Sequence, residues 1–292
     1  MGDAPAPLVF DTYGAIAGGG WEKFPGPIKE EKTMRRRAVV LVAAMAAMVL
    51  VAGGIALAAN VISCPGGICN GTTGDDEMTG TSATDYFYAK EGNDTLRGLG
   101  DFDDLRGGPG NDNLDGGRGN DQYNFYEDNW GADRISADRS GAEDWLIFFT
   151  SGALTVDLVP RPDRDEVSSG TNKINFASTV VIEWVQGGPA SDIIKGNSAN
   201  NYLLGGDLND RLVGRGGNDT MYGDIAVFSD QGNDILDGGP GRDVLDGGPG
   251  DDTFYARDGE ADEIDCGPGA DVVHADPSLD SLSRDCIDFI GP

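Results

Sequence analysis

The feature that most constrains the fold is a nine-residue repeat in which aspartate always takes the same place. Counted from Gly71, the chain reads as six consecutive nonapeptides, two of which are GGPGNDNLD and GGRGNDQYN. The sixth residue of each is aspartate: Asp76, Asp85, Asp94, Asp103, Asp112 and Asp121. The eighth residue is apolar or aromatic: Met78, Phe87, Leu96, Leu105, Leu114 and Tyr123. So short a repeat predicts a solenoid, because one unit alone can bury nothing.

The same pattern returns from Gly187 onward, with one insertion at 223–228. Its sixth positions hold Asp192, Asn201, Asp210, Asp219, Asp234, Asp243 and Asp252, and a looser last unit supplies Asp271. Asn201 keeps an oxygen but loses the charge. Asp101 and Leu208 replace the glycine of the fourth position, so we expect distorted turns there and a doubtful site beside Leu208. The insertion leaves the partner of Asp219 open.

The period has a physical explanation. Glycines at positions one, two and four let the backbone turn through angles that other residues avoid, and positions seven to nine form a short strand. Stacked turns place the eighth residues in a core and the sixth carboxylates in a line, where a spacing of about 4.8 Å makes them repel one another. We expect a hard divalent cation between them. Loops rich in carbonyl oxygens favour Ca²⁺, which tolerates flexible geometry, over Mg²⁺.

The composition supports a cation-binding protein. The chain carries 50 acidic and 21 basic side chains, a formal charge of -29. Such a surface repels nucleic acid and anionic lipid, so no nucleic-acid partner is expected. The 46 glycines alone would fit a disordered acidic tail, but four Trp, eleven Phe and eight Tyr favour a folded chain.

The N-terminal region reads as an export signal. Whether the leader at residues 1–33 belongs to the protein is left open, because translation from Met34 would give a signal of normal proportions. Residues 34–59 form a signal peptide or a membrane anchor, with three arginines followed by the apolar run Ala38–Ala59. The membrane is a partner only if this run is an uncleaved anchor. Either way, the protein is expected to be extracellular (secreted) or held at the cell surface.

The four cysteines predict disulfides. Of the three pairings that four cysteines allow, Cys64 with Cys69 and Cys266 with Cys286 are the local ones, and they close small loops near the two ends of the exported chain. A zinc site is the alternative. It would need further ligands, and His274 is the single histidine of the chain.

The nonapeptides resemble the RTX (repeat-in-toxin), or hemolysin-type calcium-binding, repeat G-G-x-G-x-D-x-U-x, closely over residues 71–124 and 187–255 and loosely over 256–274. The resemblance implies an all-β fold: a right-handed parallel β-roll (RTX β-solenoid) in two repeat blocks with a strand-rich insert. It also implies Ca²⁺ between turns on the same side, held by the sixth-position aspartates and backbone carbonyls. The implied pairs include Asp76 with Asp94, Asp85 with Asp103, Asp94 with Asp112, Asp103 with Asp121, Asp192 with Asp210, and Asp234 with Asp252.

These patterns divide the exported chain into four parts. They are a first block at 60–139, a strand-rich connector at 140–186, a second block at 187–265 and a disulfide-tied C-terminal cap at 266–292. Within the connector, the segments DWLIFF, ALTVDLV and STVVIEWV predict strands at 144–149, 153–159 and 178–185, with a polar loop at 160–165. The connector is expected to continue the solenoid; a separate small domain is the alternative.

No catalytic constellation is apparent. The sequence has neither H-E-x-x-H nor G-x-S-x-G, and carboxylates neutralised by calcium are poor general acids. We therefore expect a secreted calcium-binding β-roll that folds on binding Ca²⁺ and is not an enzyme. A calcium-dependent cell-surface adhesion or structural protein is the alternative, and a secreted hydrolase with an unrecognised site ranks below it. The macromolecular partner stays open.

Overall fold

The computed structural model describes residues 59–136, 143–160, 166–177, 181–224, 232–286, 288 and 289. All of them belong to the second of two compact units, Leu50–Pro292. The leader at 1–33, the predicted signal or anchor up to residue 58 and most of the predicted loop at 160–165 lie outside the described residues.

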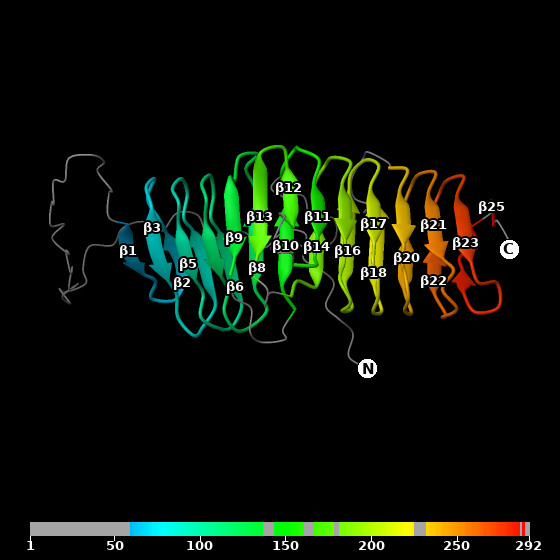
Figure 1. Cartoon of the computed structure of the whole chain (residues 1–292), viewed down its shortest axis with the longest axis horizontal. Helices are drawn as coiled ribbons and strands as arrows, with labels where there is room; N and C mark the ends of the chain where they lie inside the picture. The colour runs from blue at the N-terminus through cyan, green and yellow to red at the C-terminus, as the bar shows by residue number, and fades with distance from the viewer. Residues whose placement is uncertain are drawn as a thin grey trace, which may run out of the picture. The chain divides into compact units, whose positions relative to one another are not determined.

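Within this unit the chain forms two long sheets, and successive strands alternate between them outside the connector (Figure 1). The first sheet has fourteen strands. In spatial order they are β1 (Asn60–Ser63), β3 (Asp76–Thr79), β5 (Thr95–Arg97), β7 (Asn113–Asp115), β9 (Ala132–Ile135), β13 (Asn172–Phe176), β12 (Val167–Ser169), β11 (Thr155–Asp157), β15 (Ile193–Lys195), β17 (Arg211–Val213), β19 (Ile235–Asp237), β21 (Thr253–Ala256), β23 (Val272–Ala275) and β25 (Asp288–Phe289).

The second sheet has eleven strands, all parallel. They are β2 (Gly67–Asn70), β4 (Asp85–Tyr88), β6 (Asp103–Arg106), β8 (Gln122–Phe125), β10 (Trp145–Phe148), β14 (Trp184–Gln186), β16 (Tyr202–Gly206), β18 (Thr220–Asp224), β20 (Val244–Asp246), β22 (Glu263–Asp265) and β24 (Ser281–Leu282). The described residues contain no helix, and so none that could cross a membrane. The predicted all-β parallel β-roll is confirmed.

The core is the column of eighth-position side chains. Met78 on β3 lies in register with Leu96 on β5, and Leu96 with Leu114 on β7. These side chains, like Phe87 and Leu105 of the other sheet, are fully buried. Each such burial contributes about 1.5–3 kcal/mol. Because the strands are three to five residues long apart from the last two, each half-coil gives the core little more than one large side chain.

The connector strands lie in the same two sheets as the repeats. β10 and β14 continue the second sheet, at the places where 144–149 and 178–185 were predicted as strands, although 178–180 lie outside the described residues. β11 falls within the predicted strand at 153–159. The hairpin of β12 and β13 was not predicted, and β12 is antiparallel to both of its neighbours.

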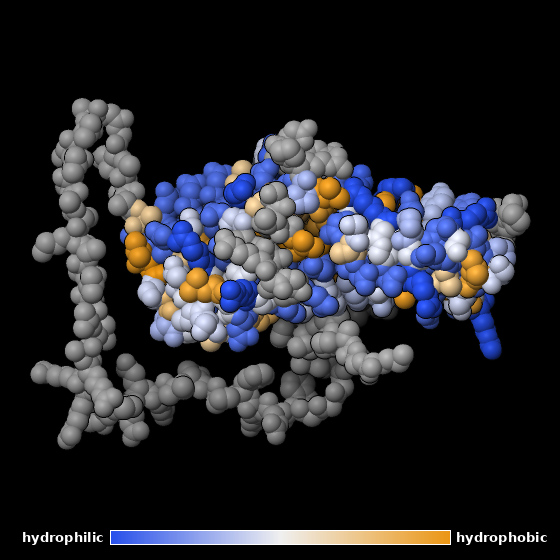
Figure 2. Space-filling model, turned by 60° about the horizontal axis from the view of Figure 1, so that its bottom comes forward, coloured by the Kyte–Doolittle hydropathy of each residue, from blue (hydrophilic) through white to orange (hydrophobic). Residues whose placement is uncertain are grey.

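An aromatic cluster fills the interior of the roll beside the connector. The rings of Phe125, Trp130 and Phe148 have centroids 5.1–5.8 Å apart, and all three side chains are buried. Trp130 is the largest fully buried side chain, so the core here depends less on repetition. On the face shown in Figure 2, hydrophilic residues cover most of the described surface, and the hydrophobic residues lie in separate patches.

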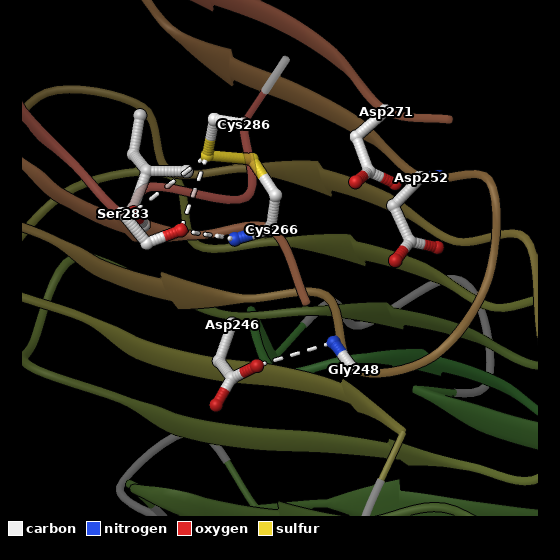
Figure 3. The surroundings of a disulfide bond; sticks show 8 residues. Asp246, Gly248, Asp252, Cys266, Asp271, Ser283 and Cys286 are labelled. Carbon is white, nitrogen blue, oxygen red and sulfur yellow. Dashed lines mark hydrogen bonds between the residues drawn. A yellow bond between two sulfur atoms is a disulfide. The ribbon is translucent and has the colours of Figure 1, made fainter. Parts of the chain in front are cut away.

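Both predicted disulfides are present, and no cysteine is free. The Cα atoms of Cys64 and Cys69 are 5.5 Å apart, and those of Cys266 and Cys286 are 5.2 Å apart. Figure 3 shows the second bridge beside Ser283, which accepts a hydrogen bond from the Cys266 amide at 3.3 Å. With all four sulfurs paired, the zinc alternative is wrong.

Neighbouring positions of β20 offer a matched test of the core. Leu245 is 0% exposed and Val244 is 37% exposed. We expect Leu245→Ala to lower the free energy of unfolding in saturating calcium by about 2–5 kcal/mol, and Val244→Ala to lower it by less than about 1 kcal/mol. Chemical denaturation measures both values. Equal losses would mean that the eighth position does not form the core.

Candidate metal centre

The glycine-rich turns bring the backbone of one coil against the next. A methyl group on Gly110, at the fourth position, would overlap the carbonyl oxygen of Gly92 in the turn on the same side. A methyl group on Gly107, at the first position, would overlap the carboxylate of Asp112 in its own turn. Glycine at these positions therefore allows both the close stacking of turns and the inward placement of the aspartate.

The turns with substituted glycines keep this geometry. Asp101 and Leu208 adopt φ values of 72° and 68°, in the left-handed region that glycine normally occupies. The stacking continues beside Leu208, where the Asp210 amide donates to Asp234 Oδ1 at 2.7 Å. The expected distortion of these turns is therefore not observed. The left-handed conformation costs such residues about 1–2 kcal/mol.

The sixth-position residues form a first carboxylate column along the turns that lead into the first sheet. In it, the backbone N–H of one aspartate donates to Oδ1 of the aspartate in the next turn on the same side, as the Asp252 amide does to Asp271 at 2.9 Å; Figure 3 shows these two side chains next to each other. The bonds of 2.7–2.9 Å join Asp76 to Asp94, Asp94 to Asp112, Asp112 to Asp133, Asp192 to Asp210, Asp210 to Asp234, Asp234 to Asp252 and Asp252 to Asp271.

A second carboxylate column follows the turns that lead into the second sheet. Its bonds of 2.7–3.1 Å join Asp85 to Asp103, Asp103 to Asp121, Asp121 to Asp144, Asp144 to Glu183, Asn201 to Asp219, Asp219 to Asp243, Asp243 to Asp262 and Asp262 to Asp280. Asp219 thus has a same-side partner in Asp243, across the insertion. Every predicted candidate residue lies in one of the two columns.

The sequence analysis did not predict five members of the columns: Asp133, Asp144, Glu183, Asp262 and Asp280. The spacing explains why. Asp112 and Asp133 are 21 residues apart and Asp121 and Asp144 are 23 apart, where two regular repeats would give 18. The signal that could have found the four aspartates is an apolar residue two positions later: Ile135, Leu146, Ile264 and Leu282. A search for the nine-residue pattern that allows insertions between units would have found them.

The second carboxylate oxygens set the chemistry of the columns. Oδ2 is buried and receives no hydrogen bond in Asp94, Asp103, Asp112, Asp210, Asp219, Asp234, Asp243, Asp252 and Asp262. These side chains are at most 3% exposed. A buried carboxylate oxygen without a donor is costly. A positive ion at this place would remove the cost.

The oxygens around these positions fit calcium. The place where a Gly80 methyl group would lie is 2.5 Å from Asp85 Oδ2 and 2.8 Å from the carbonyl oxygen of Gly98, in the next turn on that side. Carboxylate and carbonyl oxygens therefore converge between stacked turns, and both are hard ligands. No three His, Cys, Asp or Glu side chains within the described ranges converge on one point. Backbone carbonyls would complete the shell around an ion.

Burial raises the pKa of the column carboxyls. The pKa of Asp103 rises to about 8 because of burial, a hydrogen bond from the Asp85 amide lowers it, and the charges of Asp121 and Asp85 raise it further. Burial likewise raises the pKa of Asp210 to about 9 and that of Asp112 to about 7, against the lowering effect of an amide hydrogen bond. Without a cation, these groups would retain protons near neutral pH.

A parallel, exposed ladder runs along the fifth positions. The Asn111 amide donates to Asn93 Oδ1 at 3.1 Å, and the Asp251 amide donates to Asn233 Oδ1 at 2.8 Å. The recurrence of asparagine at this position was not used in the sequence analysis. These hydrogen bonds join successive turns and need no bound ion, because neutral asparagine side chains can accept them. The ladder therefore supports the register of the stack.

The fold and its columns define a parallel β-roll with the donor set of a hard divalent cation. A family model described as RTX calcium-binding nonapeptide repeat (4 copies) matches residues 70–96, 88–123, 182–212, 204–225 and 228–260. These segments are therefore RTX calcium-binding nonapeptide repeats, and the ion that such repeats bind is Ca²⁺. No curated protein matches the chain.

Leu208 offers a test of the turn geometry. It is 42% exposed and has a positive φ, whereas Leu279 is 48% exposed without one. We expect Leu208→Gly to raise the free energy of unfolding in calcium by up to about 1 kcal/mol, and Leu279→Gly to lower it. Chemical denaturation of both variants would decide. A loss of stability in Leu208→Gly would contradict the requirement for a left-handed residue there.

The raised pKa values predict how the calcium-free roll depends on pH. Because the folded-state pKa values lie above the ordinary value of 3.8, the folded state binds more protons than the unfolded state. The contribution of these carboxyls to stability is therefore fully present below about pH 4 and is lost as the pH rises through about 7–9. In EDTA, circular dichroism should show more β structure at pH 5 than at pH 8.

Asp103→Asn separates this effect from the general charge of the chain. The variant removes one group with a raised pKa and keeps an oxygen that can accept the Asp85 amide. We expect it to weaken the pH dependence and to increase β structure at pH 8 in EDTA. A parent protein that gains β structure in EDTA as the pH rises would contradict the assignment.

Proposed function

We propose that this chain is a secreted calcium-binding β-roll whose folding is coupled to Ca²⁺ binding, and that it has no catalytic activity of its own. The ions lie between same-side turns of the two carboxylate columns. The sixth-position aspartates and nearby carbonyls hold them. The ligands include the four column aspartates outside the regular nine-residue register, Asp133, Asp144, Asp262 and Asp280, as well as the aspartates of the regular repeats.

The buried, unbonded Oδ2 atoms are the observation that carries the proposal. Without an ion, the folded roll must either stack negative charges in a buried column or protonate them. Both alternatives oppose folding at neutral pH. An ion shared by two turns links the coils through the same carboxylates. Binding free energy thereby becomes folding free energy.

Other features favour a role outside the cell. Two disulfides close loops near the two ends of the roll, and disulfides persist in oxidising compartments. Extracellular calcium sites work at about 10⁻⁴–10⁻³ M, where a folding switch would remain off inside the cell and turn on outside it. The absence of catalytic activity is supported by the use of the carboxylates as ion ligands, which makes them poor proton donors.

Adjacent aspartates in one turn provide a sharp test. Asp252 is 1% exposed and belongs to the first column, while Asp251 is exposed and accepts the Ala270 amide in the fifth-position ladder. Asp252→Asn and Asp251→Asn remove the same charge and keep one amide oxygen. In calcium titrations followed by circular dichroism, we expect Asp252→Asn to need several-fold more calcium for folding, and Asp251→Asn to resemble the parent.

Magnesium is the ion control, because its stricter octahedral geometry suits these turns poorly. A parent chain that is fully folded in EDTA at pH 7.5 would overturn the coupled mechanism. So would equal calcium requirements in the two variants.

A further inference from the structure

The turns that begin the columns differ from the turns inside them. In the first turn on each side of each repeat block, four turns in all, the second-position amide donates to the sixth-position side chain of the same turn; the Asp276 amide does the same to Asp280 in the last turn of the second column. The four bonds of 2.6–2.8 Å in the first turns join Thr72 to Asp76, Thr81 to Asp85, Gly188 to Asp192 and Asn197 to Asn201. Inside the columns, second-position residues such as Gly108 and Gly239 have positive φ instead. The first turns are therefore closed by hydrogen bonds of the chain itself.

The turn at 196–201 follows the connector and has asparagine in place of the sixth-position aspartate. Its asparagines make further hydrogen bonds to the connector. Asn201 Nδ2 donates to the carbonyl oxygens of Ile182 and Glu183 at 3.3 and 3.4 Å, and Asn197 Nδ2 donates to Ile182 at 3.0 Å. Amide hydrogens, not a metal ion, thus satisfy the carbonyls below this turn.

Arg215 brings a positive charge to the same place. It stands at the second position of the next turn on that side, with φ of 80°, where a glycine is usual in this chain. Its Nη1 donates to the Gly196 carbonyl at 2.6 Å and to Asp157 Oδ1 at 2.7 Å. Gly196 begins the second block's first turn on this side, and Asp157 lies on connector strand β11. One side chain therefore joins the connector to the second block.

Lys90 repeats the arrangement in the first block. Like Arg215, it stands at the second position of the second turn on its side of its block, with φ of 81°. Its Nζ donates to the carbonyl oxygen of Gly71, the first residue of the turn that begins the column, at 2.5 Å. Asp76 of that turn accepts a further hydrogen bond from Asn60 Nδ2 at 3.0 Å.

We propose that Arg215 is a built-in cation that holds the connector to the second block in place of Ca²⁺, and that Lys90 is its counterpart at the start of the first block. The interval between Asn201 and Asp219 then takes no calcium. One carboxylate is missing there and a guanidinium is present, so a divalent ion would find less attraction and more repulsion. That part of the inference rests on the proposed calcium function of the other intervals.

The consequence is a junction that stays closed without calcium. The Arg215–Asp157 ion pair, whose side chains are 27% and 8% exposed, stabilises it without an ion. The calcium-dependent columns would then grow on either side of a region that is already folded.

Hydrogen exchange in EDTA tests the junction directly. The Leu158 amide bonds to Lys195 and the Gly196 amide to Val213, so both report on it. We expect both amides to be protected in the parent and to exchange about tenfold faster or more in Arg215→Gln, which removes the charge and shortens the side chain. Arg118→Gln, at an exposed arginine of the first block, is the control and should leave them unchanged. Equal exchange in the parent and Arg215→Gln would overturn the role of Arg215.

Ion counting by native mass spectrometry tests the missing site. Arg215→Gly combined with Asn201→Asp restores the regular pattern, and we expect about one more bound Ca²⁺ per chain than in the parent. An unchanged count would overturn the claim that these residues exclude the ion. A parent that binds no calcium at all would instead overturn the proposed function. The exchange experiment contains no calcium, so it would still test whether Arg215 stabilises the junction.

Discussion

Repulsion between stacked, buried carboxylates is the constraint on which the rest of the structure depends. Each turn places its aspartate inside the stack, where the amide of the preceding same-side turn satisfies one oxygen and, in most interior turns, no donor reaches the other. The coupling that we propose follows from this arrangement, because burying charged or protonated carboxylates opposes folding at neutral pH. In the proposed mechanism a cation removes this opposition, and the glycines that shape the turns allow the aspartates to point into the stack.

The short strands and the many glycines limit what packing alone contributes to stability. Strands of three to five residues contribute little more than one large buried side chain each, and the turns contain many glycines, whose ordering costs more entropy than that of other residues. The exceptions gather at the junction and the ends. The aromatic cluster of Phe125, Trp130 and Phe148, the Arg215–Asp157 ion pair and two disulfides stabilise the places where the repeat is interrupted or stops.

The sequence predicted the parts of the structure that follow the period. The fold class, the buried eighth positions and both disulfides are confirmed, and every predicted sixth-position aspartate lies in a column. What the sequence analysis missed lies where the period slips. Asp133 and Asp144 follow insertions that break a fixed nine-residue period, yet their carboxylates rejoin the columns.

Other features depend on tertiary contacts that no local pattern encodes. The antiparallel hairpin of β12 and β13 occupies a place in the first sheet that a regular coil would fill. Leu208 accepts a left-handed conformation because the turns above and below impose it, so the distortion expected from the lost glycine does not occur. The contact of Arg215 with Asp157 joins residues 58 positions apart.

The central claim is that calcium lies within the two carboxylate columns, and the position of the ions tests it most directly. Crystals of the calcium-loaded chain, measured at a long wavelength where calcium scatters anomalously, would locate every bound ion. The account predicts peaks between same-side aspartates, such as Asp94 with Asp112 and Asp243 with Asp262, and none between Asn201 and Asp219. Ions confined to the exposed acidic surface, with the column carboxylates left without them, would contradict it.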